Sequence, residues 1–430
     1  MFLIFLNRSI GGFMNKLIIL LFTITSSISY AAPGDIPDLI PRWLETPSTT
    51  DLTWDPAKES FLEKVTTEDL PSMIPDGTLS RFKAALEKQI VRCEKLNRIR
   101  PNTRWRFGDR VVNREQWCNQ TNHAFLELVN KSTSFSDFWE EAKTKFEWYR
   151  SKGVKNDGKV KFTGYYLPLL RGSRTRTPRF TYPVYKRPPN LVRVVIDGKK
   201  RYRKLNPDGT YSLFHDRKEI DWDGVLEGKG LEIAYVDDPI EAFFLHIQGS
   251  GSLHLLQEDG SYKRSQINFG GGNGRKYLAI GRFLRNEGVD PKYSTLQGLR
   301  RYFRERPHEI DRVFPLNQSY IFFGESEKGP YGSGGTILED GHSIATDNKL
   351  FPLGAVSLFN VTRPEVAHGE IVRWIPFSRF AVNQDTGGAI KGPSRVDIFW
   401  GEGEYAEIAA GHQNHIGGLF FALLPENKEN

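Results

Sequence analysis

The sequence from residue 385 to residue 401 reads Asp385-Thr-Gly-Gly-Ala-Ile-Lys-Gly-Pro-Ser-Arg-Val-Asp397-Ile-Phe-Trp-Gly401. A glycine-rich turn and a basic pair separate its two carboxylates, and Asp397 lies in a strand-like run of apolar and aromatic residues. Glycines let a backbone adopt positive φ or approach a ligand closely. Apolar neighbours make the ionisation of Asp397 costly, so Asp397 is a candidate general acid with Asp385 as its partner. From these residues alone, a structural aspartate that caps a turn is an equally good interpretation.

This stretch resembles the signature of the MltA-type lytic murein transglycosylases, in particular their C-terminal three-aspartate domain. The third aspartate would be Asp347, in Ala345-Thr-Asp-Asn-Lys-Leu-Phe-Pro-Leu-Gly354. Further blocks follow the family's order between Lys161 and Pro425, and they read Phe162-Thr-Gly-Tyr-Tyr-Leu-Pro168, Tyr182-Pro-Val-Tyr185 and Gln248-Gly-Ser-Gly251.

The resemblance implies a mainly β fold with helices. A double-psi β-barrel domain would carry an inserted, smaller β-barrel-like domain, with the substrate groove between them. We expect the barrel domain, with its N-terminal helices, in residues 32–166 and 319–430, and the inserted domain in residues 167–318. The length of 430 residues independently favours two domains.

Hydrophobic periodicity predicts the local elements within this plan. Apolar residues at helical spacing begin at Leu79, and helices are also expected at 124–129, 135–149, 279–285 and 296–304. Asp238-Pro239-Ile-Glu241 has the cap, first-turn proline and capping-box acid of a helix start. Strands with Asp-Gly turns are expected at 191–196, 199–205 and 211–214. The chain is expected to return to the barrel at 320–323, with further strands at 355–359, 369–376, 379–383, 396–400 and 419–424.

The resemblance also implies the chemistry. Lytic transglycosylases cleave the β-1,4 bond between N-acetylmuramic acid and N-acetylglucosamine. The muramic O6 hydroxyl attacks C1 and leaves a 1,6-anhydromuramic acid end. Because a tethered nucleophile needs no positioned water, one carboxyl that acts first as acid and then as base can suffice. Asp397 matches the family's catalytic acid, and Asp385 is expected to tune and orient it.

Other residues are predicted to bind substrate or to support the site. The substrate-binding set comprises Thr163, Tyr165, Tyr166, Gln248, Gly249, Ser250, Asn273 and Lys391. The supporting set comprises Asp347, Gly387 and Gly388. No metal or organic cofactor is implied. Two rival functions stay open: a hydrolytic, muramidase-like glycosidase that uses water as nucleophile, and a non-catalytic cell-wall binding protein.

Charge favours an acidic partner. Lys and Arg exceed Asp and Glu by 59 to 52, for a net charge of +7. The sequence has no helix-turn-helix, zinc or RNP-type signature, which argues against nucleic acid. We expect a monomer that acts on peptidoglycan glycan strands, with cell-wall synthesis or division proteins as further partners. The basic cluster from Arg187 to Lys204 is by default a solvated face, and it could also guide an anionic polymer.

The N-terminus is expected to be a targeting segment in residues 1–31, with Met14 as an alternative start and a small-x-small cleavage site at Ser29-Tyr-Ala31. The cleavage site lacks the cysteine found in lipoprotein relatives. We therefore expect an exported, periplasmic protein, with association to the outer membrane left open.

Cys93 and Cys118 are the only cysteines. In an oxidising compartment they are expected to form a disulfide, although two buried thiols are the alternative. Neither has a Cys or His at ligand spacing, and His412-x-x-His415 is interpreted as polar loop, so no metal site is predicted.

Overall fold

The computed structural model describes residues 60–76 and 79–426. The predicted targeting segment, with Met14, lies outside these ranges. Within them, no helix combines the length and apolar character that a membrane crossing requires.

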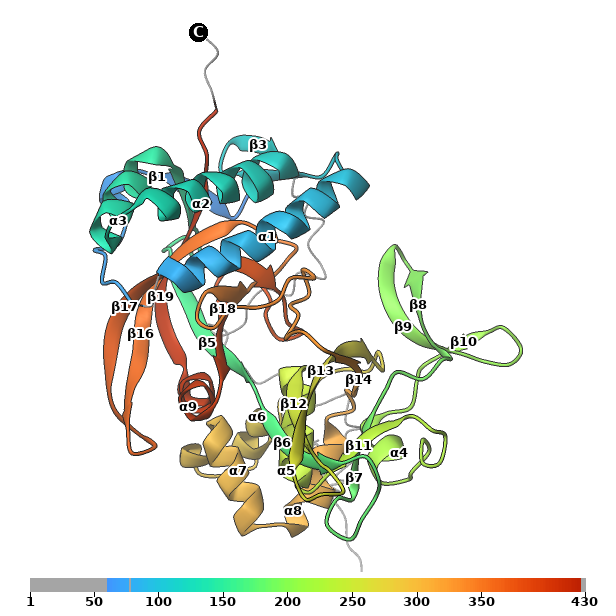
Figure 1. The fold of residues 1–430 in the computed structure, drawn as a ribbon. Coiled ribbons are helices and arrows are strands. Elements are labelled where there is room, and N and C mark those ends of the chain that lie inside the picture. Colours follow the sequence, from blue (N-terminus) through green and yellow to red (C-terminus); the bar gives the residue numbers. More distant parts are fainter. Residues whose placement is uncertain (1–59, 77–78, 427–430) are drawn as a thin grey trace, which may run out of the picture. The chain divides into compact units, whose positions relative to one another are not determined.

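A closed ring of six strands forms the first β unit (Figure 1). β5 pairs with β18 on one side and with β19 on the other, which closes the order β5-β19-β16-β17-β15-β18. Two pairings, β15 with β17 and β18 with β5, are parallel, and the others within the ring are antiparallel. β4 and then β1 extend the sheet beyond β19. The eight strands are β1 (Leu62–Val65), β4 (Glu147–Ser151), β5 (Val160–Leu167), β15 (Ser343–Ala345), β16 (Val356–Ala367), β17 (Glu370–Asp385), β18 (Arg395–Glu402) and β19 (Asn414–Leu423).

Alternating residues along these strands serve two different cores. Phe359 and Phe421 belong to one cluster with Ile398, whereas Leu358 and Phe420 belong to a second cluster with helical residues. The second cluster is completed by three helices, α1 (Leu79–Ile99), α2 (Thr121–Lys131) and α3 (Phe135–Lys145). Period-two side-chain alternation therefore lets one sheet bury both faces.

A disulfide joins Cys93 on α1 to Cys118 in the π-helical segment Glu115–Gln120, with 5.6 Å between the Cα atoms. Both cysteines are fully buried. The bridge ties the long first helix to the segment that leads into α2.

A second sheet of six strands has its own core. Its order is β14-β13-β12-β6-β11-β7, and a bridge between Lys186 and Phe323 links the two end strands. This bridge gives the sheet a barrel-like closure. The strands are β6 (Leu169–Ser173), β7 (Tyr182–Tyr185), β11 (Glu232–Val236), β12 (Gly251–Leu256), β13 (Tyr262–Gly272) and β14 (Ile321–Ser326).

Short helices and two small sheets complete the described chain. The helices are α4 (Arg217–Asp221), α5 (Pro239–Gln248), α6 (Ile280–Asn286), α7 (Leu296–Glu305), α8 (His308–Val313) and α9 (Glu404–His412), with 3-10 turns at Thr67–Asp69, Pro291–Tyr293 and Phe314–Leu316. The small sheets are β2 (Arg104–Phe107) with β3 (Arg110–Asn113), and β8 (Leu191–Ile196) with β9 (Lys199–Leu205) and β10 (Tyr211–Ser212).

Several local predictions need correction. The helix predicted to reach Tyr149 ends at Lys145, and Trp148 and Tyr149 are buried in β4. The strand at 321–326 pairs with β13, so the chain is still in the second sheet where a return to the barrel was expected. The two strands predicted at 369–376 and 379–383 form one continuous strand, β17, and α9 was not expected.

Candidate active site

Four neighbouring strands of the ring carry a row of residues at one level. Asp397 on β18 is in register with Thr163 on β5 and with Ala345 on β15, and Ala345 is in register with Asp385 on β17. In-register neighbours project from the same face of a sheet. Two strand spacings place the Cα atoms of the two aspartates roughly 9–10 Å apart. Ala345, which lies between the two aspartates, is buried and has a small side chain.

The row lies on the ring face opposite the Ile344 and Ile398 core. Arg395 and Phe399 flank Asp397 at two-residue spacing and share its face. On β5, Tyr165 lies opposite Phe399, with ring centroids 5.2 Å apart. Aromatic rings therefore border the carboxylate row.

A bulge in β17 brings Asp385 into this row. Ile344 pairs with Asn383, but the next residue, Ala345, pairs with Asp385, so Gln384 is the extra residue. Without the extra residue, Asp385 would project from the opposite face. Gln384 is buried, its side-chain amide donates to Gln89 Oε1 at 3.2 Å, and its Oε1 accepts from Ser343 Oγ at 2.5 Å. These contacts anchor the bulge in the protein interior.

Asp385 accepts three hydrogen bonds. The main-chain amides of Ser333 and Thr386 donate to Oδ1 at 2.7 and 2.8 Å, and the Tyr165 hydroxyl donates to Oδ2 at 3.0 Å. Burial raises the pKa of Asp385, while these three donors hold it down. Burial also raises the pKa of Tyr165 well above its usual value, so Tyr165 remains a hydroxyl donor.

Asp397 has a different environment. Thr163 Oγ1 donates a hydrogen bond to its Oδ1, and Arg395 Nη2 lies 4.0 Å from the same oxygen. Its side chain is 18% exposed, so the carboxyl is neither sealed in the core nor free in solvent. Burial raises the pKa of Asp397 to about 6; the charge of Asp385 adds to this rise and the charge of Arg395 opposes it.

The two environments separate the protonation states of the carboxyls. The three donors to Asp385 favour its charged form, and a charge on Asp385 favours the protonated form of Asp397. At pH 7 a group with a pKa of about 6 is protonated roughly one tenth of the time, compared with about one thousandth for an exposed aspartate. The site thus holds a proton donor beside a fixed negative charge, which suits acid–base chemistry at a glycosidic oxygen.

Asp347 is hydrogen-bonded to the 387–392 turn, which lies between the two site aspartates in the sequence. Asp347 is fully buried, and its carboxylate accepts from the Lys349 and Gly392 amides at 3.1 and 3.0 Å. Lys391 donates to the Gly387 carbonyl at 3.1 Å, and burial lowers its pKa. Both side chains therefore brace the loop between the two aspartates. Gly388 is exposed, and nothing lies within 4 Å of the position that a Cβ would occupy there.

The Gln248–Gly251 segment lies at the end of α5. Gln248 Oε1 accepts from the Tyr166 amide at 3.2 Å, which attaches this turn to β5. Gly249 has a φ of 80° and caps the helix in the left-handed region, where glycine is favoured. Ser250 is half-buried. This turn therefore lies against the same strand that carries Thr163 and Tyr165.

Tyr166 does not share the face of Tyr165. It is buried, and its hydroxyl accepts from Arg300 at 2.6 Å. Arg300 also forms ion pairs with Glu241 and Glu407 at 2.6 and 2.8 Å. Glu241, expected to close a capping box, pairs with Arg300 and Arg304 instead, while Asp238 alone caps α5. Successive strand residues point to opposite faces, so Tyr166 serves a buried ionic network and not the carboxylate row.

Asn273 has a structural role in place of the expected substrate contact. Its side chain is fully buried; Nδ2 donates to the carbonyls of His215 and Gln318, and Oδ1 accepts from the amides of Arg275 and Tyr320. All its polar capacity is thereby satisfied by main chain. The surrounding glycines approach β9, because a Cβ on Gly274 would lie 2.6 Å from the Tyr202 carbonyl oxygen.

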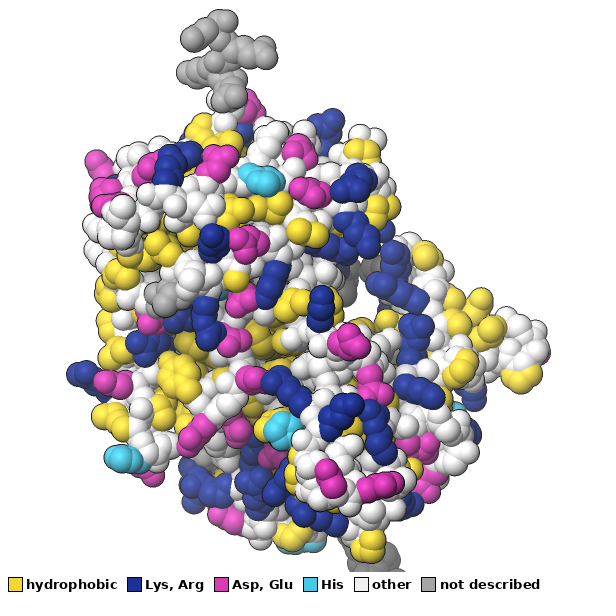
Figure 2. Space-filling model, in the orientation of Figure 1, with side chains coloured by type: hydrophobic (Ala, Val, Ile, Leu, Met, Phe, Trp, Pro, Cys, Tyr) yellow, Lys and Arg dark blue, Asp and Glu magenta, His cyan; other side chains and the backbone are white. Residues whose placement is uncertain are grey.

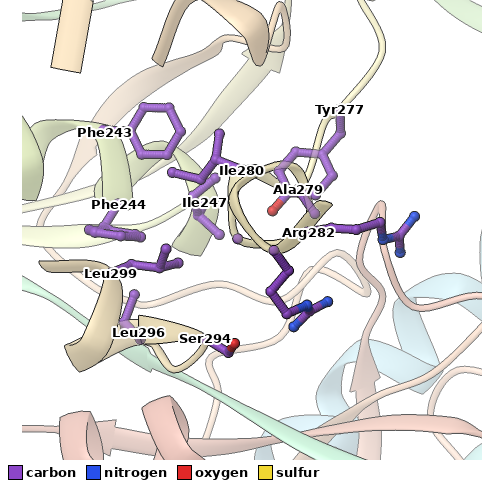
Figure 3. A pocket seen from close by; sticks show the side chains of 12 residues that line it. Phe243, Phe244, Ile247, Tyr277, Ala279, Ile280, Arg282, Ser294, Leu296 and Leu299 are labelled. Atoms are coloured by element: carbon purple, nitrogen blue, oxygen red, sulfur yellow. The ribbon is translucent and has the colours of Figure 1, made fainter. Parts of the chain in front are cut away.

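A cavity of about 270 Å³ lies among α5, α6 and α7 (Figure 3). Its walls are mainly apolar, with Phe243, Phe244 and Ile280, and Tyr277 and Arg282 lie at one side. Burial raises the pKa of Tyr277, and nearby arginines, Arg282 first among them, oppose this rise. None of the lining residues was assigned a role from the sequence.

The described residues contain no group of three or more His, Cys, Asp and Glu side chains that could hold a metal. His412 ends α9 and lies 3.0 Å from the Ile408 carbonyl, and His415 packs on Trp374 with ring centroids 4.0 Å apart. The two histidines thus have separate local partners.

Sequence reasoning missed the residues that position Asp385. Gln384 creates the bulge and Ser333 supplies an amide, and Ala345 spaces the row. The Gly332-Ser-Gly-Gly335 run was a usable signal for a close backbone approach. A Cβ on Gly332 would lie 2.5 Å from the Gln384 carbonyl oxygen. A bulge between two distant strands leaves no comparable mark in the sequence.

Family models and known proteins match most of the described chain. The MltA specific insert domain matches residues 161–324, and the 3D domain matches residues 342–422. The membrane-bound lytic murein transglycosylase A homolog of Buchnera aphidicola is 30% identical over 300 residues, which cover 69% of this chain and 74% of that protein. The membrane-bound lytic murein transglycosylase A of Escherichia coli K12 is 30% identical over 275 residues, 63% of this chain and 68% of that protein.

Solved structures share the fold. The membrane-bound lytic murein transglycosylase of Agrobacterium tumefaciens has a TM-score of 0.66 at 28% identity, over 84% of this chain and 97% of that one. E. coli MltA with bound chitohexaose has a TM-score of 0.62 at 23% identity, over 85% and 95% of the two chains, and so supports the fold alone. The six-strand ring and barrel-like second sheet agree with the expected double-psi barrel and inserted domain. The chain therefore belongs to the MltA family of lytic murein transglycosylases.

Proposed function

We propose that this protein cleaves the β-1,4 bond between N-acetylmuramic acid and N-acetylglucosamine in peptidoglycan and leaves 1,6-anhydromuramic acid ends. The observation that carries the proposal is the Asp397 carboxyl, which is 18% exposed and has a pKa raised to about 6 in a row shared with Asp385. Family membership supplies the reaction class, and this carboxyl supplies a group able to perform it.

In the first step, Asp397 donates its proton to the glycosidic oxygen as the bond to C1 breaks. The N-acetylglucosamine oxygen leaves as a hydroxyl, and positive charge develops on the muramic ring. Ionised Asp385 lies in the same row and stabilises that charge at a distance. Thr163, hydrogen-bonded to Asp397, holds the carboxyl in position.

In the second step, the muramic O6 hydroxyl attacks C1 and closes the anhydro ring. Asp397, now a carboxylate, accepts the O6 proton and returns to its starting state. The two steps together consume no water, and no cofactor takes part. Because the O6 nucleophile belongs to the same sugar as C1, the attack is intramolecular. Well-oriented intramolecular reactions reach effective molarities on the order of 10⁵ M or more.

The substrate side of the site comprises the row face of β5, with Thr163 and Tyr165, and the Gln248–Ser250 turn attached to that strand. Asp347, Lys391 and Gly387 support the loop between the aspartates. The domain division follows the two sheets, with the inserted part extended to β14 because β14 pairs with β13.

The cellular setting is the envelope. Relatives are named membrane-bound lytic transglycosylases, and the substrate is outside the cytoplasm. The protein acts on glycan strands as an exported monomer, in contact with cell-wall synthesis or division proteins.

The test is digestion of purified sacculi by the protein and by Asp397→Asn, with mass spectrometry of the released muropeptides. The protein should yield 1,6-anhydro products, and the variant should lose roughly 10²–10⁴ in rate while its circular dichroism stays unchanged. Asp109→Asn, at an exposed turn, is the matched control and should retain activity. Products heavier by one water would establish a hydrolase, and full anhydro-product formation by Asp397→Asn would overturn the assignment of the acid.

A further inference from the structure

The hairpin of β8 and β9 carries an unusual concentration of positive charge. Residues 186–205, hereafter the basic hairpin, contain eight Lys and Arg residues and one acidic residue, Asp197. Its net charge of +7 equals that of the whole 430-residue chain. Figure 2 shows Lys and Arg side chains following the strand drawn as β9 in Figure 1. The rest of the chain is therefore neutral on balance, and the surplus charge is local.

The basic hairpin combines a high density of positive charge with a lack of ion pairs among the residues that the structure describes. Arginines elsewhere form ion pairs, such as Arg264 with Glu402 at 2.6 Å and Arg312 with Glu287 at 2.8 Å. Within the described part of the chain, no ion pair involves the basic side chains of the hairpin. These side chains are Lys186, Arg187, Arg193, Lys200, Arg201, Arg203 and Lys204. The repulsion among these cations is therefore not compensated. An ordinary solvated surface reduces such repulsion with acidic residues placed among the basic ones.

The hairpin presents its charge along its length and on both faces. Val194 lies directly opposite Arg201, and Val195 directly opposite Lys200, so these basic residues face aliphatic partners. Successive strand residues point to opposite faces, so Arg201 and Arg203 share one face and Lys200 and Lys204 the other. Same-face residues on a strand are spaced about 6.6–6.8 Å apart. Val195 is 66% exposed beside these charges. Such a ladder presents several cations and some apolar surface to an extended, repeatedly charged ligand.

The second sheet fixes the base of the hairpin. Arg187 donates to the Gly270 carbonyl at 3.5 Å, and a Cβ on Gly271 would lie 3.2 Å from the Tyr202 ring. Tyr202 itself packs on the cluster around Leu191 and Phe322. The charges therefore belong to an element attached to the folded body by close backbone packing, with a defined position for its base.

We infer that the basic hairpin binds the carboxylate-bearing peptide stems of peptidoglycan. This inference rests on the proposed function, because the stems are attached to the same glycan strands. The free carboxylates of neighbouring stems form a repeated anionic array, and a guanidinium group donates two parallel hydrogen bonds to a carboxylate. Engagement of stems would hold the glycan strand to the enzyme during and between cleavage events.

An anionic membrane is the less favoured partner. The turn at residues 197–200 contains Asp197 together with Lys199 and Lys200, so the hairpin tip holds only one of the seven net positive charges. The other basic residues lie away from that turn: along β9 as far as Lys204, at Arg193 in β8, and at Lys186 and Arg187 before β8. Positive charge spread along the length of the hairpin suits an extended polymer better than a planar surface that meets only the hairpin tip.

The experiment compares three full-length proteins, each with Asp397→Asn so that the wall is not digested during binding. One has no other change, one adds R193Q, K200Q and R201Q, and one adds K95Q, R98Q and K155Q. The last set removes the same charge from exposed residues on α1 and the 152–159 loop, where no ion pair involves them within the described chain. Sedimentation measures binding to intact sacculi, to sacculi whose carboxylates have been converted to neutral amides with carbodiimide and ammonium, and to phosphatidylglycerol–phosphatidylethanolamine vesicles.

The hairpin variant should bind intact sacculi about tenfold more weakly than the other two proteins, and the difference should shrink as salt is raised. On the amidated sacculi, which keep their stems but lack free carboxylates, the three proteins should bind alike. An equal loss on both kinds of sacculi, or no loss on either, would overturn the inference. So would a hairpin-dependent binding to vesicles with sacculus binding unchanged. Release of anhydro products by the protein with Asp397 intact is measured separately, so failure of the proposed function is recognised independently.

Discussion

At the residue scale, the chemistry of the site comes from two aspartates with unlike surroundings. Asp385 receives three donors, whereas Asp397 has one hydroxyl donor and a guanidinium at 4.0 Å. The same side chain therefore serves once as a fixed charge and once as a proton carrier. Their separation across two strands is short enough for the charge of one to affect the pKa of the other.

Replacing Asp385 by Asn should shift the pH profile. The charge of Asp385 raises the pKa of Asp397, so its removal lowers that pKa. Activity that requires protonated Asp397 would then fall at lower pH, by roughly 0.3–1 unit for charges about 10 Å apart. Initial rates on sacculi between pH 4 and pH 8 measure this shift. A profile that moves to higher pH, or a loss of activity as complete as that of Asp397→Asn, would contradict the tuning role.

Asp397→Asn should also change stability in a pH-dependent way. The pKa of Asp397 is about 6 in the folded state against 3.8 as its ordinary value, so ionisation destabilises the fold. The penalty is absent below about pH 4, grows as pH rises, and is complete above pH 6. The variant should therefore be more stable than the parent at pH 8 by on the order of 2–3 kcal/mol, and similar at pH 4.

Denaturant unfolding at these two pH values measures the gap. Asp109→Asn, an exposed substitution, should show no gap at either pH. A stability gain for Asp397→Asn that is equal at pH 4 and pH 8 would show that the carboxyl is not held in a desolvated place.

At the element scale, the bulge in β17 and the loop over it place Asp385. Gly332 and Gly334 let this loop lie against the Gln384 carbonyl, and the Gly334 amide donates to that carbonyl at 3.0 Å. The same loop brings the Ser333 amide to Asp385 at 2.7 Å. The bulge therefore turns the Asp385 carboxylate into the row, and the loop packed on the bulge supplies one of the donors to that carboxylate.

Gly332→Ala should displace this loop. The new Cβ would lie 2.5 Å from the Gln384 carbonyl oxygen, a backbone atom that cannot rotate away. We expect a loss of about 1–3 kcal/mol in stability and a clear loss of activity. Gly388→Ala in the neighbouring turn is the matched control, because nothing lies within 4 Å of its Cβ position. Thermal unfolding and sacculus digestion measure both variants, and equal tolerance of the two would contradict a placing role for the loop.

Elements with local signals were predictable. The strands at 191–196 and 199–205 match β8 and β9, because alternating residues flank an Asp-Gly turn. The break predicted at Pro376 was wrong because Pro376 pairs with Thr362 of β16 on one side only; β15 reaches β17 no earlier than Val382. A proline at such a place costs no ladder hydrogen bond. Only the pairing partners reveal this, and they are distant in sequence.

The site residues likewise differ in whether a local sequence signal could predict their positions. Asp397, Thr163 and Tyr165 could be named from family motifs, and strand alternation then places Thr163 and Tyr165 on one face. Tyr166, from the same motif, points to the opposite face and meets Arg300. The glycine-rich loop around Asn273 favours a position on the surface, yet main-chain groups enclose this side chain. A family motif identifies candidate site residues, whereas the burial of each side chain depends on which distant segments of the chain pack on it.

At the scale of the whole molecule, a buried ionic network links the helices of the inserted part to the strand that carries the site. Arg300 on α7 donates to Tyr166 on β5 and pairs with Glu241 on α5 and Glu407 on α9. Its side chain is 4% exposed, so its charge depends on these partners for solvation. Removing one member of such a network leaves the others buried without compensation.

Arg300→Met should therefore destabilise the protein by about 3–5 kcal/mol, although methionine preserves much of the side-chain length. Because Tyr166 adjoins Tyr165 on β5, the loss should also reduce activity under conditions where the fold persists. Arg301→Met is the matched control: it lies on the same helix, is exposed, and contacts only the Tyr293 ring at 5.4 Å among the interactions of the described chain. Denaturant midpoints of the two variants measure the difference. Equal midpoints would show that the connection between the two sheets does not depend on this network, and would leave the single-residue link at Pro168 between β5 and β6 as the stronger constraint on the site.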